Sequence, residues 1–342
     1  MENVLAGKTV LVTGGTGSIG SEIAGQALAQ GASKVVVFSR DEIKHFLMKK
    51  RISDERLETI VGDVRDLRSI ERAFRFNIDI VYHAAAMKHV VICEDFPQEA
   101  AETNIIGTQN VVDLAGKYSV PKMITISTDK AAYPVNVMGA TKFIAERITL
   151  NANKISESNQ AFSCVRFGNV AGSRGSVIPT YVENLLNQMP LHVTDPEVTR
   201  FVMEIPEAVK LIIKATDYAQ GGEIFILRMK AFKLGDLVDV ILNGIAPRLN
   251  IVKENIKVNV TGLVTGEKLH EDLINESESS RICELDDMYV ILPDSESYAQ
   301  YPSMRKVGLP RYTSKDVELI SREEIEEIVV KYLNSHSHDL YI

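Results

Sequence analysis

Two adjacent side chains, Asp129 and Lys130, place an acid and a base at one point of the chain. They follow Thr128 and the run Lys122–Ser127 (KMITIS), whose β-branched residues predict a buried strand. General acid–base catalysis uses an acid and a base that lie close together and differ in proton affinity. Most Asp-Lys pairs lie in solvated turns, but ligands of open α/β sheets bind beyond the carboxyl ends of strands. We therefore interpret Asp129 and Lys130 as a catalytic pair.

A second segment, Met138–Lys142 (MGATK), begins a helix that we expect over 136–151. Residues four positions apart lie on the same helix face, so Met138 and Lys142 are neighbours there. Met138 has no acidic proton and cannot act as a base. Tyr133, in the loop before the helix, is a candidate base, although a packing role is the more common one for such a residue.

A glycine-rich turn connects the first predicted strand, Thr9–Thr13 (TVLVT), to a helix near Ser21–Gln30. Glycines there allow a tight turn and let backbone amides approach a pyrophosphate, which the positive end of the helix also attracts. An isolated glycine pattern is a weak signal, but the strand before it and the helix after it supply the required context. We expect a dinucleotide to bind at Gly14, Thr16, Gly17, Ser18, Ile19 and Gly20.

The ends of the next strands indicate which dinucleotide binds. The second strand ends at Ser39 and Arg40, and hydroxyl and guanidinium donors suit the 2′-phosphate of NADP. Asp41 keeps NAD as the alternative, because a carboxylate suits a free 2′-hydroxyl. After the third strand, Asp63 is expected to accept a hydrogen bond from the adenine amino group, beside Val64. After the fourth strand, small residues leave room for the cofactor: Ala84, Ala85 and Ala86.

Strand and helix patterns alternate through the first half of the chain, which predicts parallel strands with helices on both faces. Further strands are expected over 34–38, 57–61, 78–82 and 163–167, and helices over 41–51, 67–74 and 99–118. After about residue 169 the elements become shorter: helices near 206–218, 234–243 and 321–333, a strand over 223–227, and a loop entering a helix over 262–275. The fold class is α/β, a Rossmann-type doubly wound sheet over 1–168 with a smaller C-terminal lobe over 169–342 from which some elements return to the first domain.

Composition narrows the function classes. The chain has 342 residues, of which 45% are hydrophobic and 25% charged, as in ordinary globular proteins. Its net charge of −8 and the lack of a basic block argue against nucleic-acid binding. No apolar run is long enough for a membrane span, and Met1 to Gly7 do not resemble a signal peptide. Three scattered cysteines suggest a reducing cytoplasm, and no motif has the spacing of a metal site.

Taken together, the motifs resemble the extended short-chain dehydrogenase/reductase superfamily, and within it the CapD/CapE-like UDP-N-acetylglucosamine 4,6-dehydratases of polysaccharide biosynthesis. The resemblance covers nearly the whole chain: GGTGSIGSEI (14–23), FSRDE (38–42), GDVRD (62–66), HAAAMKHV (83–90), TNIIGT (103–108), STDKAAYPVNVMGATK (127–142), RFGNVAGSRGSVIP (166–179), VTDPEVTRF (193–201) and GEKLHEDL (266–273). Each motif alone is modest evidence, but their number and order make the assignment strong.

The resemblance implies a reaction on UDP-N-acetylglucosamine or a related UDP-sugar. A hydride leaves carbon 4, water is eliminated across carbons 5 and 6, and the hydride returns to carbon 6. Asp129 would protonate the departing hydroxyl, Lys130 would take the carbon-5 proton, and Lys142 would hold the nicotinamide ribose. The superfamily's usual motif is Y-x-x-x-K, and its tyrosine is replaced here by Met138. The base for carbon 4 is then Lys130, Asp129, Tyr133 or a water held by Thr128, and we favour the Asp129–Lys130 pair.

The family also implies a binding site for the nucleotide sugar. Arg200 corresponds to a diphosphate-binding arginine, and Glu267 to a ribose-binding carboxylate. Val264 stands where many relatives have a second arginine. The other residues expected to contact substrate are Lys88, His89, Asn169, Ser173, Arg174, Ser176 and Val177.

Two other functions remain open from the sequence: a UDP-sugar 4-epimerase, and a catalytically silent cofactor-binding homologue. The family further implies a homo-oligomer, a dimer or hexamer, formed through the helices over 99–118 and 136–151. Some relatives carry a membrane-spanning extension before the catalytic unit. We expect this chain to be the short, cytoplasmic form without membrane contact, and that form is more often inverting at carbon 5.

Overall fold

The computed structural model describes residues 3–154, 159–173, 175–294, 296–301 and 303–335. The chain divides into two compact units. The larger comprises Met1–Phe167, Pro206–Arg228 and Leu273–Arg311, and the smaller comprises Gly168–Ile205, Met229–Asp272 and Tyr312–Ile342. The first passage between units falls between Phe167 and Gly168. The assignment of cofactor binding to one part and nucleotide-sugar binding to the other stays a prediction.

The larger unit is built on a ten-stranded sheet with the order β16-β14-β15-β10-β6-β5-β4-β1-β2-β3. The strands from β10 to β3 are all parallel, and β15, β14 and β16 extend the sheet in antiparallel pairing. The strand bounds are β1 (Thr9–Thr13), β2 (Lys34–Ser39), β3 (Leu57–Val61), β4 (Ile80–His83), β5 (Lys122–Ile126), β6 (Ala161–Arg166), β10 (Ile224–Leu227), β14 (Ile282–Leu285), β15 (Met288–Ile291) and β16 (Arg305–Lys306). The Rossmann-type fold class is confirmed. The antiparallel extension was not predicted from the sequence.

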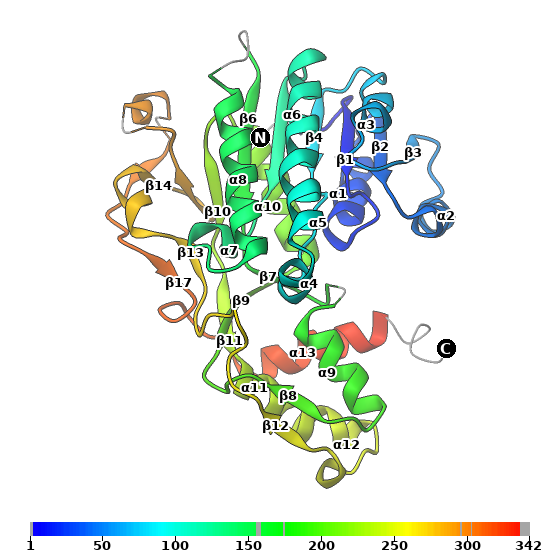
Figure 1. Cartoon of the computed structure of the whole chain (residues 1–342), viewed down its shortest axis with the longest axis vertical. Coiled ribbons are helices and arrows are strands. Elements are labelled where there is room, and N and C mark those ends of the chain that lie inside the picture. The colour runs from blue at the N-terminus through cyan, green and yellow to red at the C-terminus, as the bar shows by residue number, and fades with distance from the viewer. Residues whose placement is uncertain (1–2, 155–158, 174, 295, 302, 336–342) are drawn as a thin grey trace. The chain divides into compact units, whose positions relative to one another are not determined.

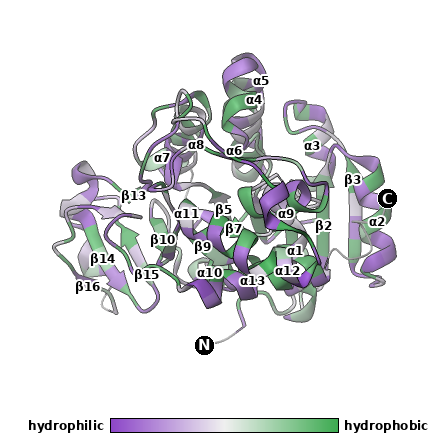
Figure 2. Cartoon of the chain, turned by 90° about the horizontal axis from the view of Figure 1, so that it is seen from below, coloured by the Kyte–Doolittle hydropathy of each residue, from purple (hydrophilic) through white to green (hydrophobic). Residues whose placement is uncertain are grey.

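Helices cover both faces of this sheet. The helix bounds are α1 (Ser18–Ala29), α2 (Glu42–Arg51), α3 (Leu67–Phe74), α4 (Val90–Asp95), α5 (Pro97–Ala101), α6 (Gly107–Lys117), α7 (Asp129–Ala132), α8 (Val137–Ala152) and α10 (Ile205–Tyr218). Helices α6 and α8 pack side by side on one face, and α1 and α10 lie on the other (Figures 1 and 2). Covering both faces explains why the central strands are continuously apolar, as in β2, whose four middle residues are all buried.

The smaller unit has its own apolar core around α9, α11 and α13. It contains a three-stranded sheet, β11-β9-β7, and a pair, β12-β8. Its elements are β7 (Asn169–Ala171), α9 (Val177–Leu186), β8 (Leu191–Val193), β9 (Thr199–Glu204), β11 (Lys230–Lys233), α11 (Leu234–Asp239), α12 (Ala246–Arg248), β12 (Val258–Val260), β17 (Tyr312–Thr313) and α13 (Arg322–Ser335). The predicted start of the last helix is confirmed, because Ser321 and Glu324 form reciprocal capping hydrogen bonds.

The helix expected over 99–118 is present as α5 and α6, which a π-helical turn, Glu102–Ile106, joins without a break. The buried Asn104 in this turn bonds through its side chain to the backbone of Met87 and to Thr141. The segment over 262–275 does not enter an α-helix, because Asp272–Ile274 forms strand β13 and a 3-10 helix follows at Glu276–Arg281.

Among the residues that the structure describes, no helix is both long enough and apolar enough to cross a membrane.

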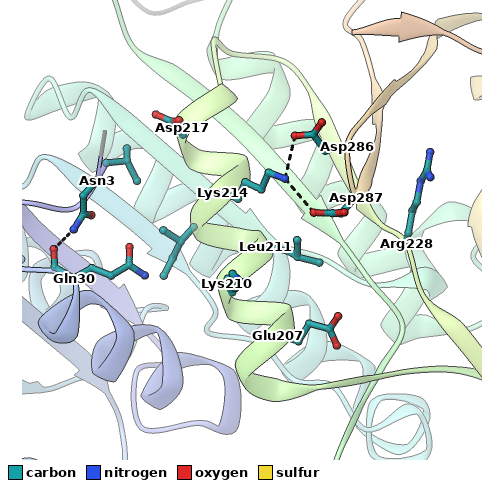
Figure 3. A pocket seen from close by; sticks show the side chains of 12 residues that line it. Asn3, Gln30, Glu207, Lys210, Leu211, Lys214, Asp217, Arg228, Asp286 and Asp287 are labelled. Carbon is teal, nitrogen blue, oxygen red and sulfur yellow. Dashed lines mark hydrogen bonds and ion pairs between the residues drawn. The ribbon is translucent and has the colours of Figure 1, made fainter. Parts of the chain in front are cut away.

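A hollow of about 860 Å³ in the larger unit lies beside α10 (Figure 3). Lys214 on its wall is held between the carboxylates of Asp286 and Asp287. None of the site residues expected from the sequence lines this hollow.

Candidate active site

The glycine-rich turn makes a close backbone cradle after β1. Gly14 adopts φ +65°, and a Cβ atom there would lie 2.7 Å from the amide nitrogen of Ala85. A Cβ on Gly20 would lie 2.4 Å from the carbonyl oxygen of Gly14. Helix α1 starts after Gly17, and no side chain caps its first amides. Ser18 and Ile19 therefore begin a helix whose positive N-terminal end suits a pyrophosphate.

At the end of β2, hydroxyl groups and one buried histidine form a hydrogen-bonded chain. The Thr16 and Ser39 hydroxyl oxygens lie 2.8 Å apart, and Ser39 Oγ lies 2.9 Å from Nε2 of His45. The carboxylate of Asp41 caps α2 by accepting from the Lys44 amide, and it forms an ion pair with the Lys44 ammonium. Asp41, the residue that left NAD as the alternative cofactor, thus binds the first turn of α2 through its carboxylate.

The carboxylate expected to meet adenine is already engaged. Both oxygens of Asp63 accept hydrogen bonds from Arg65, and Arg40 lies 3.7 Å away. Burial raises the pKa of Asp63, but the Arg65 hydrogen bonds outweigh it and the net pKa is lowered. Arg65 is a contact that the sequence did not reveal. Val64 next to it is buried against Gly107.

The loop after β4 starts from a fixed histidine. His83 is fully buried between Thr13 Oγ1, 2.7 Å from Nδ1, and Thr108 Oγ1, 2.9 Å from Nε2. Thr108 donates its own proton to the Asn104 carbonyl, so Nε2 of His83 carries the hydrogen and Nδ1 accepts from Thr13. The chain then runs through half-buried Ala84 and Ala85 to residues on the surface. These exposed residues are Ala86, Lys88 and His89.

The Asp-Lys pair lies in a short helical turn, α7, directly beyond β5. Lys130 Nζ lies 3.0 Å from Asp129 Oδ1, and Thr128 Oγ1 donates to the same oxygen at 2.8 Å. Asp129 is fully buried, and its Oδ2 has no hydrogen-bond partner among the described residues. A buried carboxylate oxygen without a partner is unusual and marks a place for a ligand or a transferred proton. Tyr133, at the end of α7, is 59% exposed.

Lys142 and Met138 occupy different environments on α8. Lys142 Nζ donates to the carbonyl of Ile126, the last residue of β5, at 2.6 Å. Burial lowers the pKa of Lys142, while Cys164 and Glu146 oppose this effect. Met138 is buried in an apolar cluster with Cys93 and Ala100. Met138 thus contributes to apolar packing, whereas Lys142 has its charged group at the strand end.

A buried ionic network, which the sequence did not predict, supports this region. Arg166 makes paired hydrogen bonds to Glu146 and to Glu278, and all three side chains are almost completely buried. Ser127, at the end of the strand before the Asp-Lys pair, donates to Glu146 at 2.6 Å. Asn275 donates to the carbonyl of Ala132 in α7 at 2.6 Å. The charged Arg166 within an otherwise apolar strand was the one sequence signal for this network.

In the smaller unit, the structure brings together two of the expected substrate residues. Arg200 Nη2 donates to Glu267 Oε1 at 2.7 Å, and Glu271 lies 3.9 Å from Arg200 Nε. Asn169 begins β7, and the loop after it carries the buried Ser173. Ser176 precedes α9, which starts at Val177, and the buried Ser176 hydroxyl has no hydrogen-bond partner within the described chain. Arg174 lies outside the described residues.

Comparison with known proteins identifies relatives along almost the whole chain. The family described as "Polysaccharide biosynthesis protein" matches residues 10–293. A protein of Methanocaldococcus jannaschii named an uncharacterized membrane protein is 44% identical, over 97% of this chain and 99% of that relative. A UDP-glucose 4-epimerase of Rickettsia canadensis is 34% identical, over 94% of this chain and 95% of the relative.

Solved structures show the same fold. The X-ray structure of Pen from Bacillus thuringiensis has a TM-score of 0.89 and 37% identity, over 96% of this chain and 98% of that one. The dTDP-glucose 4,6-dehydratase DesIV from Streptomyces venezuelae, solved with NAD and TYD bound, has a TM-score of 0.71 over 96% of this chain and 98% of that one. At 19% identity, DesIV supports the fold alone.

Proposed function

Because this chain belongs to the polysaccharide biosynthesis protein family, we propose that it is a UDP-N-acetylglucosamine 4,6-dehydratase that inverts carbon 5. Its product would be a UDP-2-acetamido-2,6-dideoxy-4-hexulose, a precursor for surface polysaccharide or glycan. One observation carries the proposal: the buried carboxyl group of Asp129 and the side-chain nitrogen of Lys130 lie 3.0 Å apart beyond the carboxyl end of β5. Such a pair supplies the acid and the base that an elimination needs.

The residues around the glycine turn fit a dinucleotide. A Cβ on Gly14 or Gly20 would collide with neighbouring backbone atoms, so only glycine allows this tight turn, and the first amides of α1 have no side-chain cap. When bound, the nicotinamide would take a hydride from carbon 4 of the sugar and return it to carbon 6. Lys142 would hold the nicotinamide ribose.

We propose NADP rather than NAD as this cofactor. Ser39 and the exposed Arg40 offer donors at the end of β2, whereas the carboxylate of Asp41 caps α2. A 2′-phosphate needs donors, and a ribose 2′-hydroxyl is best bound by a free carboxylate. Release of the bound nucleotide by denaturation and its separation by chromatography tests this choice.

The two neighbouring groups divide the proton transfers. A ketone at carbon 4 acidifies the proton on carbon 5, and Lys130 takes that proton. Asp129, after taking up the proton of the carbon-4 hydroxyl, delivers it through Oδ2 to the carbon-6 hydroxyl, which leaves as water while the carbon-5/carbon-6 double bond forms. When the hydride returns to carbon 6, carbon 5 is protonated again and Lys130 gives up the proton that it took. Met138 is buried among apolar side chains and takes no part in proton transfer. The Asp129–Lys130 pair therefore also takes the carbon-4 hydroxyl proton, for which Tyr133 and a water held by Thr128 are the alternatives.

The smaller unit supplies groups for the nucleotide part of the substrate. The guanidinium of Arg200 suits the diphosphate, and Glu267 suits the ribose hydroxyls. Local cations of this kind allow a protein of net charge −8 to bind an anionic ligand. Asn169, Ser173, Ser176 and Val177 are proposed as neighbouring contacts, and Lys88 and His89 as contacts from the loop after β4.

Mass spectrometry and proton NMR of the product test the proposal directly. Incubation with UDP-N-acetylglucosamine should give a product lighter by one water, and its ring couplings should show the inverted configuration at carbon 5. An unchanged substrate would contradict the proposal and favour a catalytically silent homologue.

We also propose that the protein acts in the cytoplasm as a dimer or hexamer formed through α6 and α8. Light scattering tests the oligomeric state.

The second candidate is a UDP-sugar 4-epimerase. It is favoured by the 34% identity to a relative named UDP-glucose 4-epimerase over 94% of this chain. An epimerase needs no base at carbon 5, so only the proton transfer at carbon 4 would be left for the Asp129–Lys130 pair. The two activities differ in product mass, because an epimerase product has the same mass as its substrate.

A further inference from the structure

One buried histidine contacts the hydroxyl groups that we assign to the 2′ position of the cofactor. His45, on α2, is 4% exposed. Its Nε2 lies 2.9 Å from the Ser39 hydroxyl and 3.1 Å from the Ser39 carbonyl oxygen. The Ser39 hydroxyl lies in turn 2.8 Å from that of Thr16. The chain of contacts joins the glycine turn, the end of β2 and the first half of α2.

The surroundings of His45 determine where its proton lies. A carbonyl oxygen only accepts, so Nε2 must carry the hydrogen that is donated to Ser39. Burial lowers the pKa of His45, which keeps the ring neutral with this single N–H. The Ser39 hydroxyl oxygen then faces a donor, and its own hydrogen is left to point toward Thr16 or toward a ligand.

We propose that His45 is a positioning residue that selects NADP by orienting the Ser39 hydroxyl as a donor. This inference rests on the proposed NADP site. A phosphate presents only acceptor oxygens, so an oriented donor at this point stabilises it. A ribose 2′-hydroxyl gains less from the same donor. His45 therefore influences which cofactor binds without touching it.

Two variants separate the donated hydrogen bond from the packing of the ring. His45→Leu removes the donor and fills the buried position with an apolar side chain. His45→Gln can instead place an amide N–H near Ser39. We expect His45→Leu to weaken NADP⁺ binding about tenfold, which is the usual effect of one lost hydrogen bond. The affinity for NAD⁺ should stay unchanged. His45→Gln should restore most of the preference. Calorimetric titration of cofactor-free protein with each dinucleotide measures both affinities, and thermal melting checks the fold.

The control background is Ser39→Ala, which removes the group that His45 orients. In that background His45→Leu should change the NADP⁺ affinity little, because the two residues act through one contact. If the ratio of the two affinities in His45→Leu is the same as in the wild type, whether or not both affinities fall, the inference is overturned. A wild-type protein that prefers NAD⁺ would instead overturn the cofactor assignment on which it rests.

Discussion

Asp129 accepts a hydrogen bond from Lys130 through one carboxylate oxygen, while its other oxygen has no hydrogen-bond partner among the described residues. Its Oδ1 accepts from Lys130 Nζ at 3.0 Å and from the Thr128 hydroxyl at 2.8 Å. Its Oδ2 is buried and has no hydrogen-bond partner among the described residues. The carboxylate is thus anchored on one side and available for proton transfer on the other. This asymmetry supports the proposed acid role of Oδ2 and the proposed base role of the lysine.

Replacement of the lysine should remove the base. We expect Lys130→Met to lower the dehydration rate of UDP-N-acetylglucosamine by about 10²- to 10⁴-fold, the range that general acid–base groups contribute. The exposed Lys210 on α10 provides a control, because Lys210→Met changes the same charge outside the site. The rate is measured by mass spectrometry of the product. Full activity of Lys130→Met would refute the assigned role.

Replacement of the acid should separate oxidation from elimination. In Asp129→Asn, the amide can still accept from Lys130 and Thr128, but Oδ2 is lost as a proton donor. We expect elimination to stop while Lys130 still accepts protons, so that reduced nicotinamide accumulates and its absorbance rises on addition of substrate. Normal product formation by this variant, with no such absorbance, would rule out the acid role.

Two glycines should respond in opposite ways to the same substitution. A Cβ on Gly14 would lie 2.7 Å from the Ala85 nitrogen, whereas a Cβ on Gly25 within α1 would meet nothing within 4 Å. We expect Gly14→Ala to abolish dinucleotide binding. Gly25→Ala should keep it and raise the free energy of unfolding by about 0.5–1 kcal/mol, because alanine favours the helix. Urea unfolding and chromatography of the bound nucleotide measure these effects. Tight binding by Gly14→Ala would contradict the cradle.

The buried His83 should make stability depend on pH. Burial, with a smaller contribution from Lys142, lowers the pKa of His83 from 6.5 to about 3. Between these values the unfolded chain binds a proton that the folded protein does not, so stability is lost as the pH falls below 6.5. The contribution is at most about 1.4 kcal/mol per pH unit.

His83→Asn is the matched variant, because it keeps a polar side chain between the two threonine hydroxyls. Its free energy of unfolding, measured in urea, should fall less steeply than that of the wild type as the pH falls below 6.5. Equal slopes for the two proteins would show that His83 is protonated in the folded state.

The smaller unit should control substrate affinity through Arg200. Arg200→Lys keeps the charge but loses the planar fork that matches a diphosphate. We expect KM for the UDP-sugar to rise about tenfold, the effect of one lost charge-assisted hydrogen bond, with a smaller change in kcat. Lys257→Ala, at an exposed position of the same unit, is the control. A fall in kcat at unchanged KM would place Arg200 outside the binding site.

Local sequence patterns were enough to predict the glycine turn and the parallel strands around it. The glycine turn depends on backbone geometry that only glycine allows, and apolar runs bounded by turns mark parallel strands. The contacts of charged side chains were harder to predict. Asp63 was assigned to adenine, yet it bonds to Arg65, and Asp41 was considered for a ribose, yet it caps α2. In both cases the partner lies within three residues along the chain. The choice among nearby polar partners leaves no repeating pattern in the sequence from which it could be predicted.

Residue type and short-range spacing were sufficient to predict the parallel strands of the sheet, the glycine turn and the position of the Asp-Lys pair at a strand end. What surrounds these features depends on the tertiary structure. It placed Arg166 between Glu146 and Glu278, residues from distant parts of the chain. It also buried Met138 in an apolar cluster and left one oxygen of Asp129 open. These features depend on contacts between remote segments, where burial changes the cost of each unpaired charge.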